Sequence, residues 1–222
     1  TRRRSRSAAL AATSPPTPGA EWEHSSEVIA RRLNNVNGGS AITAESTSYD
    51  PGDDLTDKDA LVVQFVSLPL AAQTIAAQTI KLQCQMVEGG AGNNLFMAWQ
   101  IYLIDSGGAA VGGGTILAIR RDDVELATSQ TNRGDSATST EVTAAATNRI
   151  CLELGWGGLP TATGGTDDHD GIMRIGEDGA SDLPENDTET SALNPWLEFA
   201  NTLTFAGTVP VASAQYRTRR VN

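Results

Sequence analysis

The densest group of potential metal ligands in the sequence is the run from Thr166 to Gly171, in which three carboxylates surround a histidine. Oxygen-rich loops of this kind bind Ca²⁺. The carboxylates of Asp167, Asp168 and Asp170 do not follow the alternating pattern, with a distal glutamate, that a compact calcium loop requires. We therefore expect neither a metal nor another cofactor and interpret the run as a solvated turn, with Ca²⁺ at these three aspartates as the alternative.

A second acidic segment runs from Glu177 to Glu189. Long loops without regular structure are frequently functional. This one could hold a cation or receive an arginine-rich tail. A solvated loop is the interpretation that we favour over a metal site.

Residues that could act as nucleophiles or general bases are few. The two histidines, His24 and His169, stand apart from any Gly-x-Ser-x-Gly elbow, P-loop or HExxH motif. A Ser-His-Asp arrangement around His169 would have no marked nucleophile. We predict that the protein is not an enzyme; the competing hydrolase hypothesis requires one of these histidines in a pocket beside a serine or a carboxylate.

Four tryptophans could bind sugar rings by stacking. Trp99 and Trp156 lie within apolar runs, which predicts that they belong to the core. Trp22 and Trp196 lie at the edges of predicted strands and are the candidates for glycan stacking.

Two shorter signals carry less weight. The tripeptide Arg133-Gly134-Asp135 matches a cell-adhesion motif, but its Ser, Thr and Asn neighbours favour an ordinary exposed turn. Cys84 and Cys151 have no CxxC spacing and lie in apolar, strand-like runs, so buried free thiols are favoured. A disulfide between adjacent strands stays open as the alternative.

The elements that must position these residues are β-strands. The alternation is clearest where Ile80, Leu82, Cys84 and Met86 face one way and the polar residues between them face the other. In residues 150–156 the even-numbered side chains point inward and Glu153 points outward. Further strand-like runs cover 61–68, 95–104, 115–120, 172–175 and 196–205, separated by Gly-, Asp-, Asn- and Pro-rich turns. The pattern predicts an all-β, two-sheet antiparallel β-sandwich, jelly-roll-like.

The charges are distributed unevenly along the chain. The net charge is −11, yet residues 1–20 and 207–222 contain no acid. These ends hold seven arginines: Arg2, Arg3, Arg4, Arg6, Arg217, Arg219 and Arg220. We predict a basic, Pro-rich extended arm at 1–21, a sandwich domain at 22–206 and a basic tail at 207–222.

The basic ends and the acidic body suggest two kinds of partner. The arms are expected to dock on the acidic body of a neighbouring subunit. Basic arms also bind nucleic acid phosphates, but an acidic body repels that polymer, so direct nucleic acid binding is not expected. No apolar stretch reaches the length of a membrane span, so no membrane partner is expected either.

Several stretches resemble known sequences. Residues Gly171-Ile-Met-Arg-Ile-Gly176, the acidic loop that contains Leu183-Pro-Glu185, and Asn194-Pro-Trp-Leu-Glu-Phe199 are similar to a pattern in tailed-bacteriophage structural proteins. Trp22-Glu23 followed by Gly39-Ser-Ala-Ile-Thr43 fits the same type. The stretch Phe65-Val-Ser-Leu-Pro-Leu70 resembles the opening of galactose-binding-like jelly rolls.

The resemblance covers residues 22–206 and implies a virion component, of the decoration or tail type, on a jelly-roll-like sandwich. It does not distinguish a head decoration from a tail part or a fibre, and it carries over no catalytic residues. The expected localisation is the virion, with other copies of the chain and other virion proteins as partners. The alternative is a carbohydrate-binding, host-recognition module.

Overall fold

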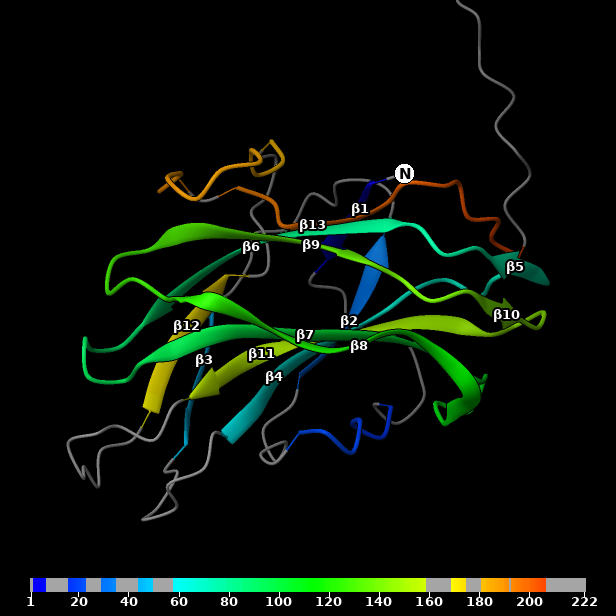
Figure 1. The fold of residues 1–222 in the computed structure, drawn as a ribbon, viewed down its shortest axis with the longest axis horizontal. Helices are drawn as coiled ribbons and strands as arrows, with labels where there is room; N and C mark the ends of the chain where they lie inside the picture. The colour runs from blue at the N-terminus through cyan, green and yellow to red at the C-terminus, as the bar shows by residue number, and fades with distance from the viewer. Residues whose placement is uncertain are drawn as a thin grey trace, which may run out of the picture.

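A computed structural model describes residues 2–6, 16–22, 29–34, 44–49, 58–158, 169–174, 181–191 and 193–206 of the 222-residue chain. For 2–6, 29–34, 44–49, 58, 158, 169 and 170 only the backbone is described. These residues form thirteen strands and no helix (Figure 1). The strands are β1 (Arg2–Arg6), β2 (Ile29–Asn34), β3 (Ala44–Tyr49), β4 (Lys58–Val66), β5 (Gln73–Ile75), β6 (Thr79–Glu88), β7 (Leu95–Ile104), β8 (Ala110–Glu125), β9 (Thr131–Thr138), β10 (Val142–Ala144), β11 (Arg149–Gly158), β12 (His169–Arg174) and β13 (Trp196–Phe199).

The main sheet folds over on itself into a sandwich. Its strand order is β3-β12-β6-β13-β1-β2-β4-β11-β7-β8, and β9 pairs with β6. In Figure 1 one layer contains β6, β9 and β13, and the other contains β4, β11, β7 and β8. All pairs in this sheet are antiparallel except β2 and β4, which run parallel. The prediction of an all-β sandwich is confirmed.

The core lies between the two layers and follows the predicted alternation. The side chains expected inward on β6 and β11 are all buried in one hydrophobic cluster: Ile80, Leu82, Cys84, Met86, Ile150, Leu152, Leu154 and Trp156. Trp99 and Trp156 are fully buried there, as predicted. The two layers are therefore held by the faces that the period of two assigns to the interior.

The N-terminal residues differ from the prediction of an arm outside the body. Strand β1 lies inside the sheet, with Arg2–Arg4 paired to β13 and Arg4–Arg6 paired to β2 of the same chain. Both edges of an extended segment find backbone partners in this position, which satisfies its N–H and C=O groups. Residues 16–22 also contact the body, through Glu153. The boundary predicted at residues 21 and 22 is therefore wrong, because both described parts of the arm belong to the sandwich.

Other predictions fall partly outside the described residues. The tail 207–222, with Arg217, Arg219 and Arg220, lies outside them, as do His24, Asp167 and Asp168. Arg2, Arg3, Arg4 and Arg6 are placed in β1 by their backbone alone. No part of the chain that the structure describes forms a helix long and apolar enough to cross a membrane.

Candidate functional site

A row of polar side chains crosses the outer face of the layer formed by β4, β11 and β7. Glu153 on β11 is in register with Gln64 on β4 and with Gln100 on β7. Their neighbours along each strand point into the core, so these three point to the opposite face. Nevertheless all three are buried, and the exposed fraction of Glu153 is 0%.

Three donors from the sheet itself hold the Glu153 carboxylate. Gln64 Nε2 donates to Oε1 over 2.7 Å and Gln100 Nε2 donates to Oε2 over 2.6 Å. The Tyr102 hydroxyl donates to Oε1 over 2.7 Å. The pKa of Tyr102 is raised, mainly by burial and to a smaller extent by the nearby Cys151 and Glu153. The phenol therefore keeps its proton and acts as the donor.

Residues 16–22 supply the remaining donors and cover the carboxylate. The Gly19 amide lies 3.1 Å from Oε1 and 3.2 Å from Oε2, and Trp22 Nε1 donates to Oε2 over 2.7 Å. The Tyr102 hydroxyl also lies 3.3 Å from the Thr17 carbonyl oxygen. Bonds to an ionised acceptor are stronger than bonds between neutral groups. Glu153 therefore fastens this segment to the sandwich.

Close backbone approach explains the glycine in the segment. A Cβ at Gly19 would collide with Gln100 Nε2 and would also crowd the Glu153 carboxylate. The Trp22 amide bonds back to the Gly19 carbonyl over 3.4 Å, which turns the chain between the two anchors. Only glycine lets the Gly19 amide reach the carboxylate without displacing the polar row.

The indole of Trp22 occupies an apolar patch next to the polar row. It packs with Leu61 and Ala98, which are the residues paired with Gly155 on the neighbouring strands. The register between β11 and β4 shifts at Leu154 and Gly155, and a Cβ at Gly155 would collide with the Ala60 carbonyl. Because Gly155 has no side chain, nothing projects from β11 between Leu61 and Ala98, the two residues on which the ring packs.

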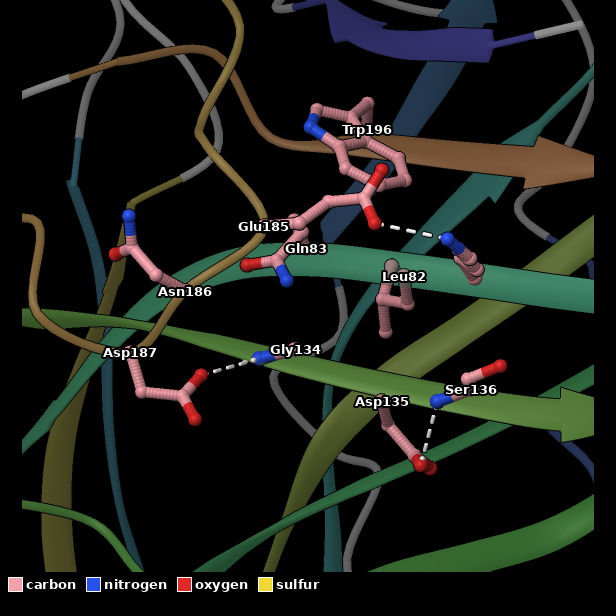
Figure 2. Close-up of a pocket in the computed structure, with 10 residues that line it drawn as sticks. Leu82, Gln83, Gly134, Asp135, Ser136, Glu185, Asn186, Asp187 and Trp196 are labelled. Carbon is pink, nitrogen blue, oxygen red and sulfur yellow. Dashed lines mark hydrogen bonds and ion pairs between the residues drawn. The ribbon is translucent and has the colours of Figure 1, made fainter.

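A second site lies on the outer face of the other layer, over β6 and β9. A pocket of about 420 Å³ is lined by residues of these strands, of the loop 181–191 and by Trp196 (Figure 2). Lys81 and Glu185 form an exposed ion pair of 2.8 Å across it. The Gly134 amide donates to Asp187 Oδ1 over 3.2 Å.

Asn132 on β9 holds the acidic loop in place. Its Nδ2 donates to the carbonyls of Pro184, over 3.0 Å, and of Asn186. Its Oδ1 accepts the Glu189 amide over 2.8 Å. The exposed fraction of Asn132 is 0%, so the described part of the predicted acidic loop is bound to the sheet through a buried amide and is not simply solvated.

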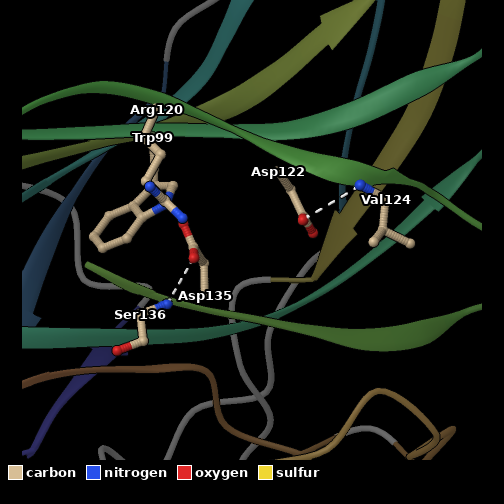
Figure 3. Close-up of polar contacts among 6 residues, drawn as sticks. All are labelled: Trp99, Arg120, Asp122, Val124, Asp135 and Ser136. Atoms are coloured by element: carbon tan, nitrogen blue, oxygen red, sulfur yellow. Dashed lines mark hydrogen bonds and ion pairs between the residues drawn. The ribbon is translucent and has the colours of Figure 1, made fainter.

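Asp135 connects the two layers along their open edges (Figure 3). It accepts a hydrogen bond from Trp99 Nε1 on β7 over 2.8 Å and one from Arg120 Nε on β8 over 2.6 Å. The tripeptide 133–135 is thus part of strand β9, and the interpretation of an exposed turn is wrong. Arg133 is also buried and donates to the Glu125 carbonyl, so its guanidinium points into the protein.

The structure contradicts the predicted glycan-stacking platform. Trp22 is 6% exposed and Trp196 is 1% exposed. Trp22 is covered because its indole N–H bonds to Glu153, and Trp196 because its indole N–H donates to the Leu183 carbonyl over 2.7 Å. Neither ring has a face open for a sugar.

The thiols and potential metal ligands behave as follows. Cys84 and Cys151 are free and buried, which confirms the favoured interpretation, and burial raises the pKa of both thiols. Within the described ranges no three His, Cys, Asp or Glu side chains gather to hold a metal ion. Asp170 and His169 are placed in β12 by their backbone alone, so the calcium alternative stays untested.

Comparison with known proteins adds no family. No family model and no curated protein matches the chain. Among solved structures, a CocE/NonD family hydrolase from Staphylococcus aureus is similar over 77% of this chain and 34% of its own, at 8% identity and a TM-score of 0.44. The infectious bursal disease virus Gx strain is similar over 82% of this chain and 40% of its own, at 13% identity and a TM-score of 0.22. The chain spans about a third of the hydrolase, and neither likeness is close enough to carry an argument about function.

Sequence reasoning placed Glu153 outward but did not single it out as a site. One signal was available: Glu153 is the lone charged residue in the apolar run 150–156. The second signal was the Pro-Gly-x-x-Trp spacing of residues 18–22. Nothing in the sequence joins the two, because Trp22 and Glu153 are 131 residues apart.

Proposed function

We propose that this chain is a non-enzymatic structural subunit of a virion, of the capsid-decoration or tail type. It would assemble through contacts between copies and through its terminal segments. The observation that carries the proposal is the fastening of residues 16–22 to the outer face by the buried Glu153. A short Pro-rich stretch builds no core of its own and acquires a defined position only by docking.

The charge distribution supports this proposal. The seven arginines lie at the two ends of a chain whose net charge is −11. Opposite charges on the ends and on the body favour association between copies, and closed symmetric assemblies repeat such a contact at every subunit. The resemblance to tailed-phage structural proteins points in the same direction.

The alternative function, a carbohydrate-binding module, loses the observation on which it depended. Its stacking candidates were Trp22 and Trp196, and both rings are buried. No other observation favours a glycan over a protein partner, so we do not propose this function.

The mass of the purified protein in solution tests the proposal. Light scattering at about 20 mM and about 500 mM salt compares weak and strong screening of charges. We expect an oligomer that is larger at low salt, and a smaller mass for a variant with Arg217, Arg219 and Arg220 replaced by glutamine. A monomer of 23.3 kDa at every salt and protein concentration would contradict the proposal.

A further inference from the structure

We propose that the outer face around Glu153 is a peptide-recognition site that accepts residues 16–22 of a second copy of this chain. The contact within one chain is then the self-occupied form of an interface between copies. This inference deepens the proposed assembly role and rests on it for the identity of the partner. The recognition of the peptide itself rests only on the geometry of the site.

The bound segment has the properties of a short linear ligand. Within the described residues, its backbone–backbone hydrogen bonding is internal, from the Trp22 amide to the Gly19 carbonyl. Its attachment depends on the Gly19 amide, the Thr17 carbonyl and the Trp22 side chain. Two anchors three residues apart, one a backbone amide and one an indole, resemble the anchors by which grooves recognise extended peptides.

The receiving face is formed by the strands without help from the segment. Gln64, Gln100 and Tyr102 hold the carboxylate from β4 and β7, so its oxygens already point at the places that the incoming donors occupy. A site on rigid strands loses little entropy when a peptide binds. The face therefore keeps its shape when residues 16–22 leave it.

One buried polar atom at the site has no partner. Gln64 Oε1 is buried and accepts no hydrogen bond from the residues that the structure describes, although the Nε2 atom of the same amide binds Glu153. An unpaired buried acceptor costs free energy, and a peptide donor that reaches it would recover that cost. An identical segment from a second copy would leave the same atom unpaired, so this atom favours neither source of the segment.

Exchange between copies requires no new contact at the Glu153 site, but residues 16–22 must leave their own sandwich while β1 and β2, which flank them in the sequence, stay paired there. The donors of residues 16–22 meet the same acceptors whether the segment comes from the same chain or from another one, which is the condition for low-cost swapping of an element. The chain's own segment competes at an effective concentration of the order of millimolar. Occupation by a second copy is therefore favoured where copies are concentrated, as on a growing assembly.

The test uses the full chain and a labelled peptide with the sequence of residues 14–24. The receptor is the Gly19→Ala variant, in which the added Cβ collides with Gln100 and displaces the chain's own segment. Gly92→Ala is the matched control, because a Cβ there meets nothing within 4 Å. Fluorescence anisotropy should show Gly19→Ala binding the peptide at least about tenfold more tightly than the wild type or Gly92→Ala, since the competing segment is gone.

Two further variants separate recognition from nonspecific adhesion. A peptide with Trp22→Ala, and a receptor with both Gly19→Ala and Glu153→Gln, should each bind at least about tenfold more weakly, because each lacks one anchor. Equal binding by the wild type and Gly19→Ala, or no effect of Glu153→Gln, would overturn the proposal. If Gly19→Ala loses its thermal unfolding transition, Trp22→Ala in the full chain serves as the receptor with the same expected order of affinities.

Mixing two full-length variants tests the second copy as the source of the segment. Tagged Gly19→Ala keeps the face and loses the segment, whereas untagged Glu153→Gln keeps the segment and loses the carboxylate. We expect the tagged chain to retain the untagged one, and to retain untagged Gly19→Ala at least about tenfold less, because that chain has no segment to offer. Peptide binding without this retention would overturn exchange between copies, while a monomeric wild type that still binds the peptide would contradict only the proposed assembly role.

Discussion

Replacing Glu153 by glutamine tests whether the carboxylate is the anchor of the N-terminal segment. The change keeps the shape of the side chain and removes one acceptor. In the wild type, Oε2 accepts hydrogen bonds from Trp22 Nε1 and Gln100 Nε2, and Oε1 accepts them from Gln64 Nε2 and the Tyr102 hydroxyl. In either orientation the new NH₂ group faces two side-chain donors, while the Gly19 amide, which lies near both oxygens, keeps the remaining oxygen as its acceptor, so two hydrogen bonds to a charged acceptor are lost.

The expected loss in the free energy of unfolding follows from the two lost hydrogen bonds and from one hydrogen bond that Gln64 can re-form. A hydrogen bond to a charged group contributes about 1.5–3 kcal/mol. Gln64 can rotate its amide, because in the described part of the wild-type chain its Oε1 accepts no bond, and this oxygen can then accept a hydrogen bond from the new NH₂ group. With one of the two bonds partly recovered, we expect a loss of about 2–4 kcal/mol in the free energy of unfolding. For a chain of this length that loss lowers the melting temperature by roughly 5–15 °C.

Urea unfolding and a thermal scan measure the loss, and hydrogen exchange locates it. The amides of residues 16–22 should exchange faster in Glu153→Gln than in the wild type, because the segment has lost its acceptor. Glu141→Gln is the control, since Glu141 is exposed and a surface change of this kind stays within about 0.5 kcal/mol. A loss below about 1 kcal/mol, with unchanged exchange over 16–22, would refute Glu153 as the anchor.

Three further measurements follow from the described contacts. Asp135→Ala leaves the indole N–H of the buried Trp99 without its acceptor, so urea unfolding should show a loss of about 2–4 kcal/mol. Because burial raises the pKa of the Cys84 and Cys151 thiols, a disulfide reagent should modify them only in denaturant. Burial also raises the pKa of Glu88 above 4.5, so its ionised form opposes folding at neutral pH. Glu88→Gln should therefore have a higher urea midpoint than the wild type at pH 7, and the difference should shrink as the pH falls towards 4.5.

The core could be predicted from the sequence because its signal is local. Side chains alternate across a strand with a period of two, so the inward faces of β6 and β11 can be assigned without knowing their neighbours. The length of β7, Leu95–Ile104, also agrees with the apolar run at 95–104. These features depend on nearest neighbours along the chain and on burial of apolar surface, which the residue types encode directly.

Strand β1 could not be predicted because its signal is not local. Residues 2–6 are four arginines and a serine, with no apolar alternation. Their strand conformation comes from backbone pairing with β13 and β2, whose partners lie near residues 197 and 33. The parallel pair of β2 and β4 is likewise a product of the final topology. Composition correctly indicated extended backbone at this end but assigned it to the wrong place.

The predictions for Trp22 and Trp196 failed for a related reason. The position of a residue at the end of a predicted strand indicates its backbone conformation, but it does not indicate which distant segment covers its side chain. Trp22 is covered by an interaction with β11, and Trp196 by the loop that contains Leu183. Both indoles keep a polar N–H that requires a partner once the ring is buried, and both find one in a distant segment.

Three polar residues of this sandwich, the buried Glu153 and Asn132 and the partly buried Asp135, share one physical role. Glu153 fixes residues 16–22, Asn132 fixes the acidic loop, and Asp135 joins the edges of the two layers. Each stands on a strand and binds groups that lie far away along the chain. Because a buried polar group without partners costs about 1–3 kcal/mol, each of these side chains stabilises the fold only when its segment is in place. A single carboxylate within a mostly apolar strand, such as Glu153 on β11, is therefore evidence of a segment docked on the outer face of that strand.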